Sequence, residues 1–115
     1  MADTLCRVEI HRGSGFPVAR ITGEVDISNV EQIEAGLDEV AVKEPLFVVD
    51  LTETEYFDSA GIRMLFGLAN RSKARGKQLR VVAPHDAIVR RVLEITHFAS
   101  VVPVYPSIEE GIASL

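Results

Sequence analysis

The sequence is poor in the residues from which disulfide scaffolds and metal centres are built. Cys6 is the only cysteine, so the chain can form no internal disulfide and no cysteine-rich metal site. The three histidines, His11, His85 and His97, are scattered, and none has a partner ligand three or four residues after it. We therefore expect surface or hydrogen-bonded histidines, with neither a metal ion nor a cofactor.

Sequence signatures of phosphate-binding and hydrolase sites are missing as well. The loops GxGxxG and GxxxxGK[ST] are absent, and Gly13-Ser14-Gly15 lies between two expected strands, which is the wrong context. A nucleophile elbow reads GxSxG, but residues 57–61 read FDSAG and lack the first glycine. Nothing in the sequence orients His85 toward Ser59 as a base. We expect a protein that is not an enzyme.

Long apolar runs and basic stripes are also absent. No run approaches the ~20 residues that span a bilayer. Residues 1–4 have no basic region followed by an apolar core, so we expect no signal peptide and no membrane partner. The net charge of −5 makes nucleic acid a poor candidate partner. These absences predict a cytoplasmic protein. One basic group is typical of the solvated face and C-terminal end of a helix: Arg71, Lys73, Arg75, Lys77 and Arg80.

The residues that are present predict one α/β domain over residues 1–115. Apolar residues make up 47% of the chain and charged residues 25%, which are ordinary values for a globular protein. The chain is organised around residues 46–68. An apolar strand over 46–51, expected to be covered on both faces, leads through a polar connection into a helix that starts at Asp58 or Ser59. That helix is expected to end near residue 75, with Gly76 as its stop signal.

Strands and helices alternate through the rest of the chain. Residues 5–12 and 16–23 predict a hairpin, with Pro17 favouring an edge position for its second strand. The remaining elements are a helix capped by Asp26 or Ser28 with Val30, Ile33, Leu37 and Val40 on one face, a strand over 79–82, a helix over 85–96 with Arg90 and Arg91 exposed, an edge strand over 101–105 containing Pro103, and a helix from Ser107 to Leu115. The order β-β-α-β-α-β-α-β-α predicts a mixed sheet with an N-terminal hairpin, a parallel centre and helices packed on it.

Ser59 is the main candidate for a functional residue. A hydroxyl at a helix N-terminus lies near unpaired backbone N–H groups and the positive end of the helix dipole, where a phosphoryl group is well accommodated. Ser59 could instead be a plain helix cap, a role that Asp58 would fill equally well. Capping does not explain Gly61, because glycine in a first helical turn costs about 1 kcal/mol relative to alanine. With Ala60 beside it, Gly61 suggests a small, exposed patch where a partner docks.

Three segments resemble the STAS domain of anti-sigma factor antagonists, and the similarity covers nearly the whole chain. They read TGEVD over residues 22–26, VDLT over 49–52 and FDSAGI over 57–62, in the order that the pattern of elements requires. In that family the third segment usually reads Asp-Ser-Ser-Gly followed by Leu or Ile. Ala60 replaces the second serine here, so the resemblance implies one phosphoacceptor, Ser59.

The resemblance further implies partner switching without catalysis by this chain. The unphosphorylated protein would bind an anti-sigma factor that is an ATP-dependent serine kinase and so free the sigma factor. Phosphorylation of Ser59 would end the complex, and a phosphatase of the metal-dependent serine/threonine class would restore the hydroxyl. Acidic side chains expected in loops at this end of the sheet are Glu24, Asp26, Glu53, Glu55 and Asp58. The expected partner-binding residues are Glu24, Asp26, Asp58, Ser59, Ala60, Gly61 and Met64.

Two other functions remain open at this point. One is a constitutive STAS subunit of a stress-signalling or transporter complex, indifferent to the charge at Ser59. The other is a small nucleotide-binding regulator, which calorimetry with ATP, GTP and GDP would test.

Overall fold

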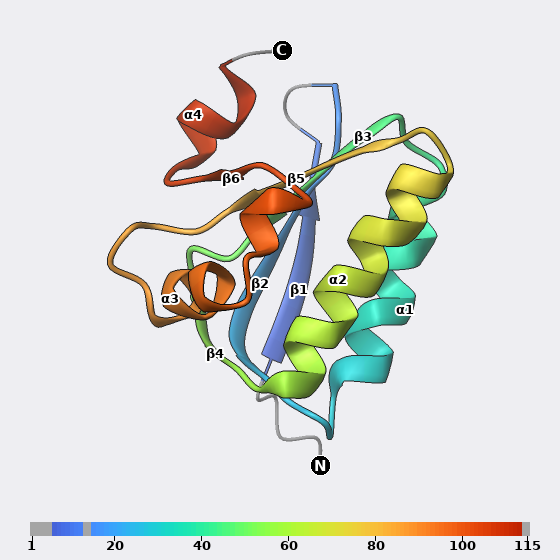
Figure 1. The fold of residues 1–115 in the computed structure, drawn as a ribbon. Helices are drawn as coiled ribbons and strands as arrows, with labels where there is room; N and C mark the ends of the chain where they lie inside the picture. The colour runs from blue at the N-terminus through green and yellow to red at the C-terminus, as the bar shows by residue number, and fades with distance from the viewer. Residues whose placement is uncertain (1–5, 13–14, 114–115) are drawn as a thin grey trace.

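A mixed sheet forms the centre of the protein in the computed structural model, which describes residues 6–12 and 15–113. Its strands within these residues are β1 (Cys6–His11), β2 (Val18–Val25), β3 (Leu46–Asp50), β4 (Thr54–Phe57), β5 (Gln78–Val82) and β6 (Val104–Tyr105). The order across the sheet is β1-β2-β3-β5-β6, and β4 pairs with β2 beyond the end of β3. β1 and β2 are antiparallel and the other pairs are parallel, which confirms the predicted hairpin and parallel centre (Figure 1).

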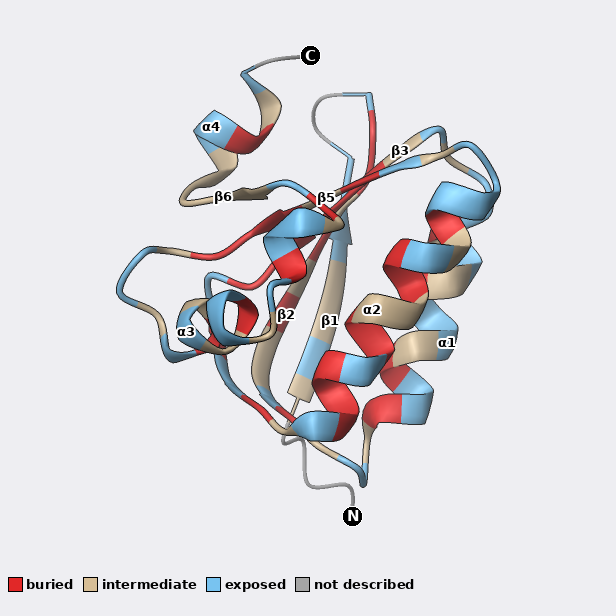
Figure 2. Cartoon of the chain, viewed as in Figure 1, coloured by how far each residue is buried: buried red, intermediate tan, exposed pale blue. Residues whose placement is uncertain are grey.

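The helices cover both faces of this sheet. They are α1 (Val30–Ala41), α2 (Ser59–Ala74), α3 (Ile88–Ile95) and α4 (Ile108–Ile112), with a 3-10 turn η1 (Phe98–Ser100) after α3. Val49 and Val81 lie in the larger core with the buried residues of α1, α2 and α3. Their neighbours Val48 and Val82 point to the other face, where side chains of α4 cover them. The two-residue alternation of a strand therefore explains why β3 is buried on both sides (Figure 2).

The segment 54–57 forms a strand that the sequence pattern did not indicate. We expected a polar connection after β3, but β4 adds alongside the second half of β2. The hydroxyl of the buried Thr54 donates to the carbonyl of Ile21 at 2.6 Å, and Phe57 is 3% exposed. Between them, Glu55 and Tyr56 are both exposed, so burial does not alternate along β4 and gives no period of two.

The expected edge position of the second strand is wrong. β2 lies between β1 and β3, and Pro17 precedes its first residue. Pro17 contributes only its carbonyl, which accepts from the N–H of Val48 at 3.1 Å. A proline at this position therefore loses no ladder hydrogen bond. The turn residues Gly13 and Ser14, and Leu5 of the expected first strand, lie outside the described residues.

In the C-terminal third, α3 and β6 are shorter than predicted. α3 starts at Ile88 because residues 84–87 form a turn closed by the Ala87 N–H on the Pro84 carbonyl. Arg90 is only partly exposed and donates to the carbonyl of Ala83 at 2.6 Å. β6 is an edge strand as predicted but only two residues long, and Pro103 lies before it. Ser107 caps α4 as predicted. Leu115 lies outside the described residues.

Two expectations about side chains near the helices change. Neither Asp26 nor Ser28 caps α1, whose N-cap residue is Asn29 without a side-chain cap bond. Arg71 is not part of a solvated basic face, because it joins α2 to α1 through Glu34 at 2.8 Å and Asp38 at 3.0 Å. The predicted buried face of α1 is confirmed for Val30, Ile33 and Leu37, with Val40 partly buried.

No helix of the part described, residues 6–12 and 15–113, has both the length and the apolar character that crossing a membrane requires.

Candidate functional site

The ends of β2 and β4 and the starts of α1 and α2 meet at one end of the molecule, at the bottom of Figure 1. A bulge at Gly23 and Glu24, with Gly23 at a φ of 104°, redirects the end of β2 toward β4. Glycine suits that positive φ because it has no side chain. The end of β2 then passes directly into the loop before α1. We call the group of residues 24–28 and 55–59 the switch end.

Asp58 ties the two loops of the switch end together. One carboxylate oxygen accepts from the N–H groups of Ala60 at 2.9 Å and Gly61 at 3.1 Å, which caps α2. The other oxygen accepts from the N–H of Ile27 at 3.1 Å, in the loop before α1. The predicted cap at Asp58 is therefore confirmed. The same side chain also holds the loop before α1 against the start of α2.

Ser59 is the first residue of α2 and is exposed. Its hydroxyl makes no hydrogen bond to any part of the chain that the structure describes. Since Asp58 already satisfies the helix cap, capping does not account for a serine at this position. Ser59 is therefore open to a reaction from solvent, at the first position of a helix.

The expected exposed patch at Ala60 and Gly61 is wrong, because both residues are buried. A Cβ atom at Gly61 would lie 3.1 Å from Cγ of Phe57 and 3.2 Å from Cγ1 of Val25. The glycine therefore allows α2 to pack closely on the ends of β2 and β4, and it is no sign of an approaching ligand. Met64, one turn on, is only 3% exposed.

The acidic residues expected at this end lie partly in strands. Glu24 is in β2 and Glu55 in β4, both exposed, while Glu53 precedes β4 and offers its carbonyl to Gly23. Asp26 lies in the loop before α1, where its carboxylate accepts from the Ser28 hydroxyl at 2.5 Å and the Ser28 N–H at 2.9 Å. These bonds lower the pKa of Asp26, so its negative charge persists.

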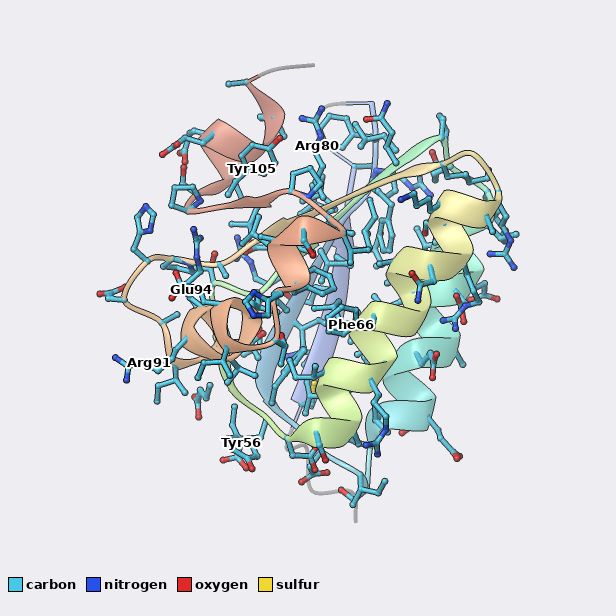
Figure 3. The ribbon with its side chains drawn as sticks, in the orientation of Figure 1. Tyr56, Phe66, Arg80, Arg91, Glu94 and Tyr105 are labelled. Carbon is cyan, nitrogen blue, oxygen red and sulfur yellow. The ribbon has the colours of Figure 1, made fainter. Side chains whose placement is uncertain are left out.

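Three further residues at this end were not predicted from the sequence. Ile27 is 71% exposed and Tyr56 is 47% exposed, so both present apolar surface to solvent at this end (Figure 3 shows Tyr56). Arg63 is exposed and lies four residues after Ser59, on the same face of α2. An isolated Ile in a polar loop was the available signal for Ile27, and the spacing of four was the signal for Arg63.

A shallow groove between α1 and α2 adjoins the switch end. It has a volume of about 280 Å³ and is lined by residues of both helices and of the loop before α1, among them Ile27, Ala60, Arg63 and Met64. Ala60 and Met64 are buried, so they form its floor and Arg63 stands at its rim. Of the predicted partner-binding residues, Ala60 and Met64 line this groove.

The segment VDLT over 49–52 also has a structural role. Asp50 is fully buried and accepts from the N–H of Thr52 at 2.9 Å, the hydroxyl of Thr52 and Arg20 at 3.2 Å. Such a turn fixes where the chain goes after β3. It sends β4 along β2 and so delivers Asp58 and Ser59 to the switch end.

Acidic, histidine and cysteine side chains do not gather into a metal-binding group of three in the described part of the chain. His85 is exposed in the loop after β5 and makes no hydrogen bond to Ser59.

Comparison with known proteins gives a consistent result. The chain is 35% identical over 103 residues to BtrV of Bordetella bronchiseptica, which is named as a candidate anti-sigma factor antagonist, covering 87% of this chain and 86% of that protein. An anti-sigma factor antagonist from Mycobacterium paratuberculosis superposes with a TM-score of 0.86 at 22% identity, over 99% of this chain and 97% of that one. SpoIIAA superposes in its unphosphorylated form with a TM-score of 0.74 at 20% identity, over 94% and 95% of the two chains. In its phosphorylated form, described for Bacillus, the TM-score is 0.70 at 19% identity, over 94% and 98%.

A family model described as the STAS domain matches residues 7–111. Together with the identity to BtrV, this match shows that the chain belongs to the STAS domain family.

Proposed function

We propose that this protein is an anti-sigma factor antagonist that is switched by phosphorylation of Ser59. Unphosphorylated, it binds an anti-sigma factor with serine kinase activity and releases the sigma factor. The kinase transfers the γ-phosphoryl group of ATP to the Ser59 hydroxyl and the complex dissociates. A metal-dependent serine/threonine phosphatase reverses the modification. The protein acts as regulator and substrate, without catalysis of its own.

The observation that carries this proposal is the division of labour between two neighbouring residues. Asp58 caps α2 through the N–H groups of Ala60 and Gly61, and it also holds the loop before α1 through the N–H of Ile27. Ser59 is exposed and its hydroxyl is unbonded among the described residues. A serine that contributes nothing to the fold, fixed at the first position of a helix, is suited to presentation to a kinase. The similarity to BtrV, a candidate anti-sigma factor antagonist, and to SpoIIAA, which is described in a phosphorylated form, adds support.

Phosphorylation of Ser59 is expected to change the surface and leave the fold intact. The added group carries about −1.5 to −2 charges near pH 7. It would lie outside the packed core, near the positive end of the α2 dipole and one helical turn from Arg63, where an i, i+4 pair can form. In a complex, the added charge beside Asp26 and Asp58 must lose its hydration, and an acidic partner surface would repel it.

The partner surface that fits this function is the switch end with the groove between α1 and α2. Ile27 supplies an exposed apolar anchor and Arg63 a cation, while Asp26 and Glu24 supply negative charge. Ala60 and Met64 form the floor of the groove between α1 and α2. This arrangement of an apolar centre and a charged rim is typical of protein interfaces.

The test is a binding measurement against each anti-sigma factor kinase of the host, by calorimetry with wild type, Ser59→Ala and Ser59→Glu. We expect Ser59→Ala to bind like wild type but to resist phosphorylation. Ser59→Glu should bind more weakly, and the phosphorylated protein about a thousandfold more weakly, which corresponds to about 4 kcal/mol.

Asn70→Glu is the matched control, because Asn70 is exposed on the same face of α2, about 16 Å further along at 1.5 Å per residue. It adds the same charge and should leave binding unchanged. If Ser59→Glu and the phosphorylated protein bound like wild type, the switch would be refuted. The protein would then act as a constitutive STAS subunit.

A further inference from the structure

A second groove lies at the opposite end of α2 from Ser59. It has a volume of about 260 Å³ and opens between the end of α2, β5 and the segment 101–105 that includes β6. Ser72, which lines this groove, lies thirteen positions after Ser59 in the helix, or about 20 Å at 1.5 Å per residue. Figure 3 places the labelled Arg80 and Tyr105 at this end, away from Tyr56. No residue of this groove belongs to the switch end.

The groove is positively charged in a protein whose net charge is −5. Lys73, Lys77 and Arg80 line it, and no acidic residue does. Neither lysine has an ion-pair partner among the described residues. Arg80 is held in place, since one guanidinium nitrogen donates to the carbonyl of Gly111 at 2.7 Å and the group lies 5.7 Å from the ring centroid of Tyr105. The guanidinium of Arg80 is therefore held on the α4 side of the sheet, and the two lysines are the cations that an anion beside Ser72 meets.

Ser72 gives an independent sign of a ligand. The residue is 4% exposed and lines the groove, yet its hydroxyl makes no hydrogen bond within the part of the chain that is described. Buried hydroxyls in helices ordinarily bond the carbonyl four residues before. The Ser72 hydroxyl is not sealed off either, since no fully buried polar atom lacks a partner. It is therefore a donor that faces the groove and is free to bond a ligand.

The negative end of α2 does not cancel this charge. The N–H of Lys77 donates to the Ser72 carbonyl at 2.9 Å and the N–H of Gly76 to the Lys73 carbonyl at 3.0 Å. Gly76 has a φ of 70°, so the helix ends in a Schellman motif that satisfies its last carbonyls. Interaction with the helix dipole can therefore explain why a cation stands at Lys73, but not why the other two cations are there. Lys77 and Arg80 lie beyond the helix.

The other wall of the groove is apolar. Leu79 and Val102 are each 5% exposed and Ala69 is 2% exposed, and Val101 and Pro103 extend the same surface. A small pocket with apolar walls and a few convergent polar groups is the usual form of a ligand site. We propose that this groove binds a small phosphorylated molecule, with its phosphate on Ser72, Lys73 and Lys77 and an apolar or flat body on the wall of Leu79 and Val102.

The test uses phenyl phosphate as the probe in an NMR titration of backbone amides, with inorganic phosphate in parallel. We expect saturable shifts in residues 72–80 and 101–105 with phenyl phosphate, and binding at least several-fold weaker with inorganic phosphate. Lys73→Gln/Lys77→Gln should weaken phenyl phosphate binding about tenfold, the equivalent of about 1.4 kcal/mol. Ser72→Ala should weaken it less, with the fold kept.

Lys43→Gln/Arg75→Gln is the matched control. Both residues are exposed and neither lines the groove, so the same two charges are removed without touching it. This control should bind within twofold of wild type. Three results would overturn the proposal. The two double variants could lose binding equally, or the two probes could bind equally well. Phenyl phosphate could also give no saturable shift at concentrations up to about tenfold above 1 mM, a dissociation constant that already marks weak binding. Ser59 has no part in any of these outcomes, so they stand apart from the phosphorylation switch.

Discussion

The two ends of α2 differ in charge, in how the helix is terminated and in the groove that lies beside each end. At the N-terminal end a carboxylate, Asp58, satisfies the first N–H groups, and Ser59 stands exposed beside it. At the C-terminal end Gly76 closes the helix through its backbone, and the buried Ser72 faces a basic groove. Each end carries a serine that the fold does not use. We propose that the first is modified and that the second contacts a ligand.

The two proposed sites depend on different parts of the chain. The N-terminal site depends on a local motif, since Asp58 and Ser59 are adjacent in sequence. The C-terminal site depends on β5 and on the segment 101–105, which lies nearly thirty residues after Ser72 in the chain. Substitutions at the first end should therefore act through packing and capping, and those at the second through backbone geometry and charge.

Gly61→Val should have the largest effect on stability. The added Cβ atom alone would lie 3.1 to 3.2 Å from side-chain atoms of Phe57 and Val25, which is closer than most Cβ contacts in proteins. We expect a loss of about 3 kcal/mol in the free energy of unfolding, measured by urea denaturation. Gly36→Val is the control, since no atom lies within 4 Å of the added Cβ in α1. Equal effects of the two changes would contradict close packing at the switch end.

Asp58→Ala should come next, at about 2 kcal/mol, because it removes the cap of α2 and the bond to the loop before α1. Ser59→Ala should change stability by less than about 0.5 kcal/mol, as for other exposed positions. Urea denaturation of the two variants separates the roles of the neighbours. A Ser59→Ala loss as large as that of Asp58→Ala would return Ser59 to the role of a cap.

Gly76→Ala should cost about 1 kcal/mol, because its φ of 70° is unfavourable for a residue with a Cβ. Gly36→Ala, inside α1, should instead stabilise by about 0.5–1 kcal/mol through helix propensity. Opposite signs in thermal unfolding would sharpen the contrast between a stop glycine and a replaceable one. Stabilisation by both substitutions would show that Gly76 is not needed to end α2.

The smallest expected effect is the pH dependence of Asp26. The Ser28 hydroxyl and N–H lower its pKa below the ordinary aspartate value of about 3.9. A lowered folded-state pKa adds stability that is present above the unfolded-state value and is lost as pH falls through the folded-state value. A carboxyl-carbon NMR titration should place Asp26 below its ordinary value, and Ser28→Ala should raise it. An unshifted Asp26 would remove this source of fixed charge from the switch end.

Local patterns in the sequence predicted the parts of this fold that local rules control. The helical spacing after Asp58 predicted α2, Gly76 predicted its end, and Ser107 predicted the cap of α4. β4 was missed because its burial depends on a bulge at Gly23 and Glu24, thirty residues earlier in the chain. Long-range pairing of this kind leaves no period in the sequence.

Only those features of the candidate site that depend on local sequence were predicted. Asp58 and Ser59 are recognisable from a cap motif. The burial of Ala60, Gly61 and Met64 follows from the approach of α2 to β2 and β4, which no spacing reveals. The exposure of Ile27 likewise depends on where Asp58 holds the loop before α1.

The most direct test of the switch is to map phosphate on the protein isolated from its own cells. Trypsin should release residues 44–63, a peptide that contains Thr52, Thr54, Tyr56 and Ser59. The hydroxyls of Thr52 and Thr54 are bonded to Asp50 and to the Ile21 carbonyl, whereas that of Ser59 is exposed. Fragmentation by mass spectrometry should place a growth-dependent phosphate on Ser59 alone. A peptide that stays unmodified, even after incubation with every anti-sigma kinase of the host, would contradict the switch.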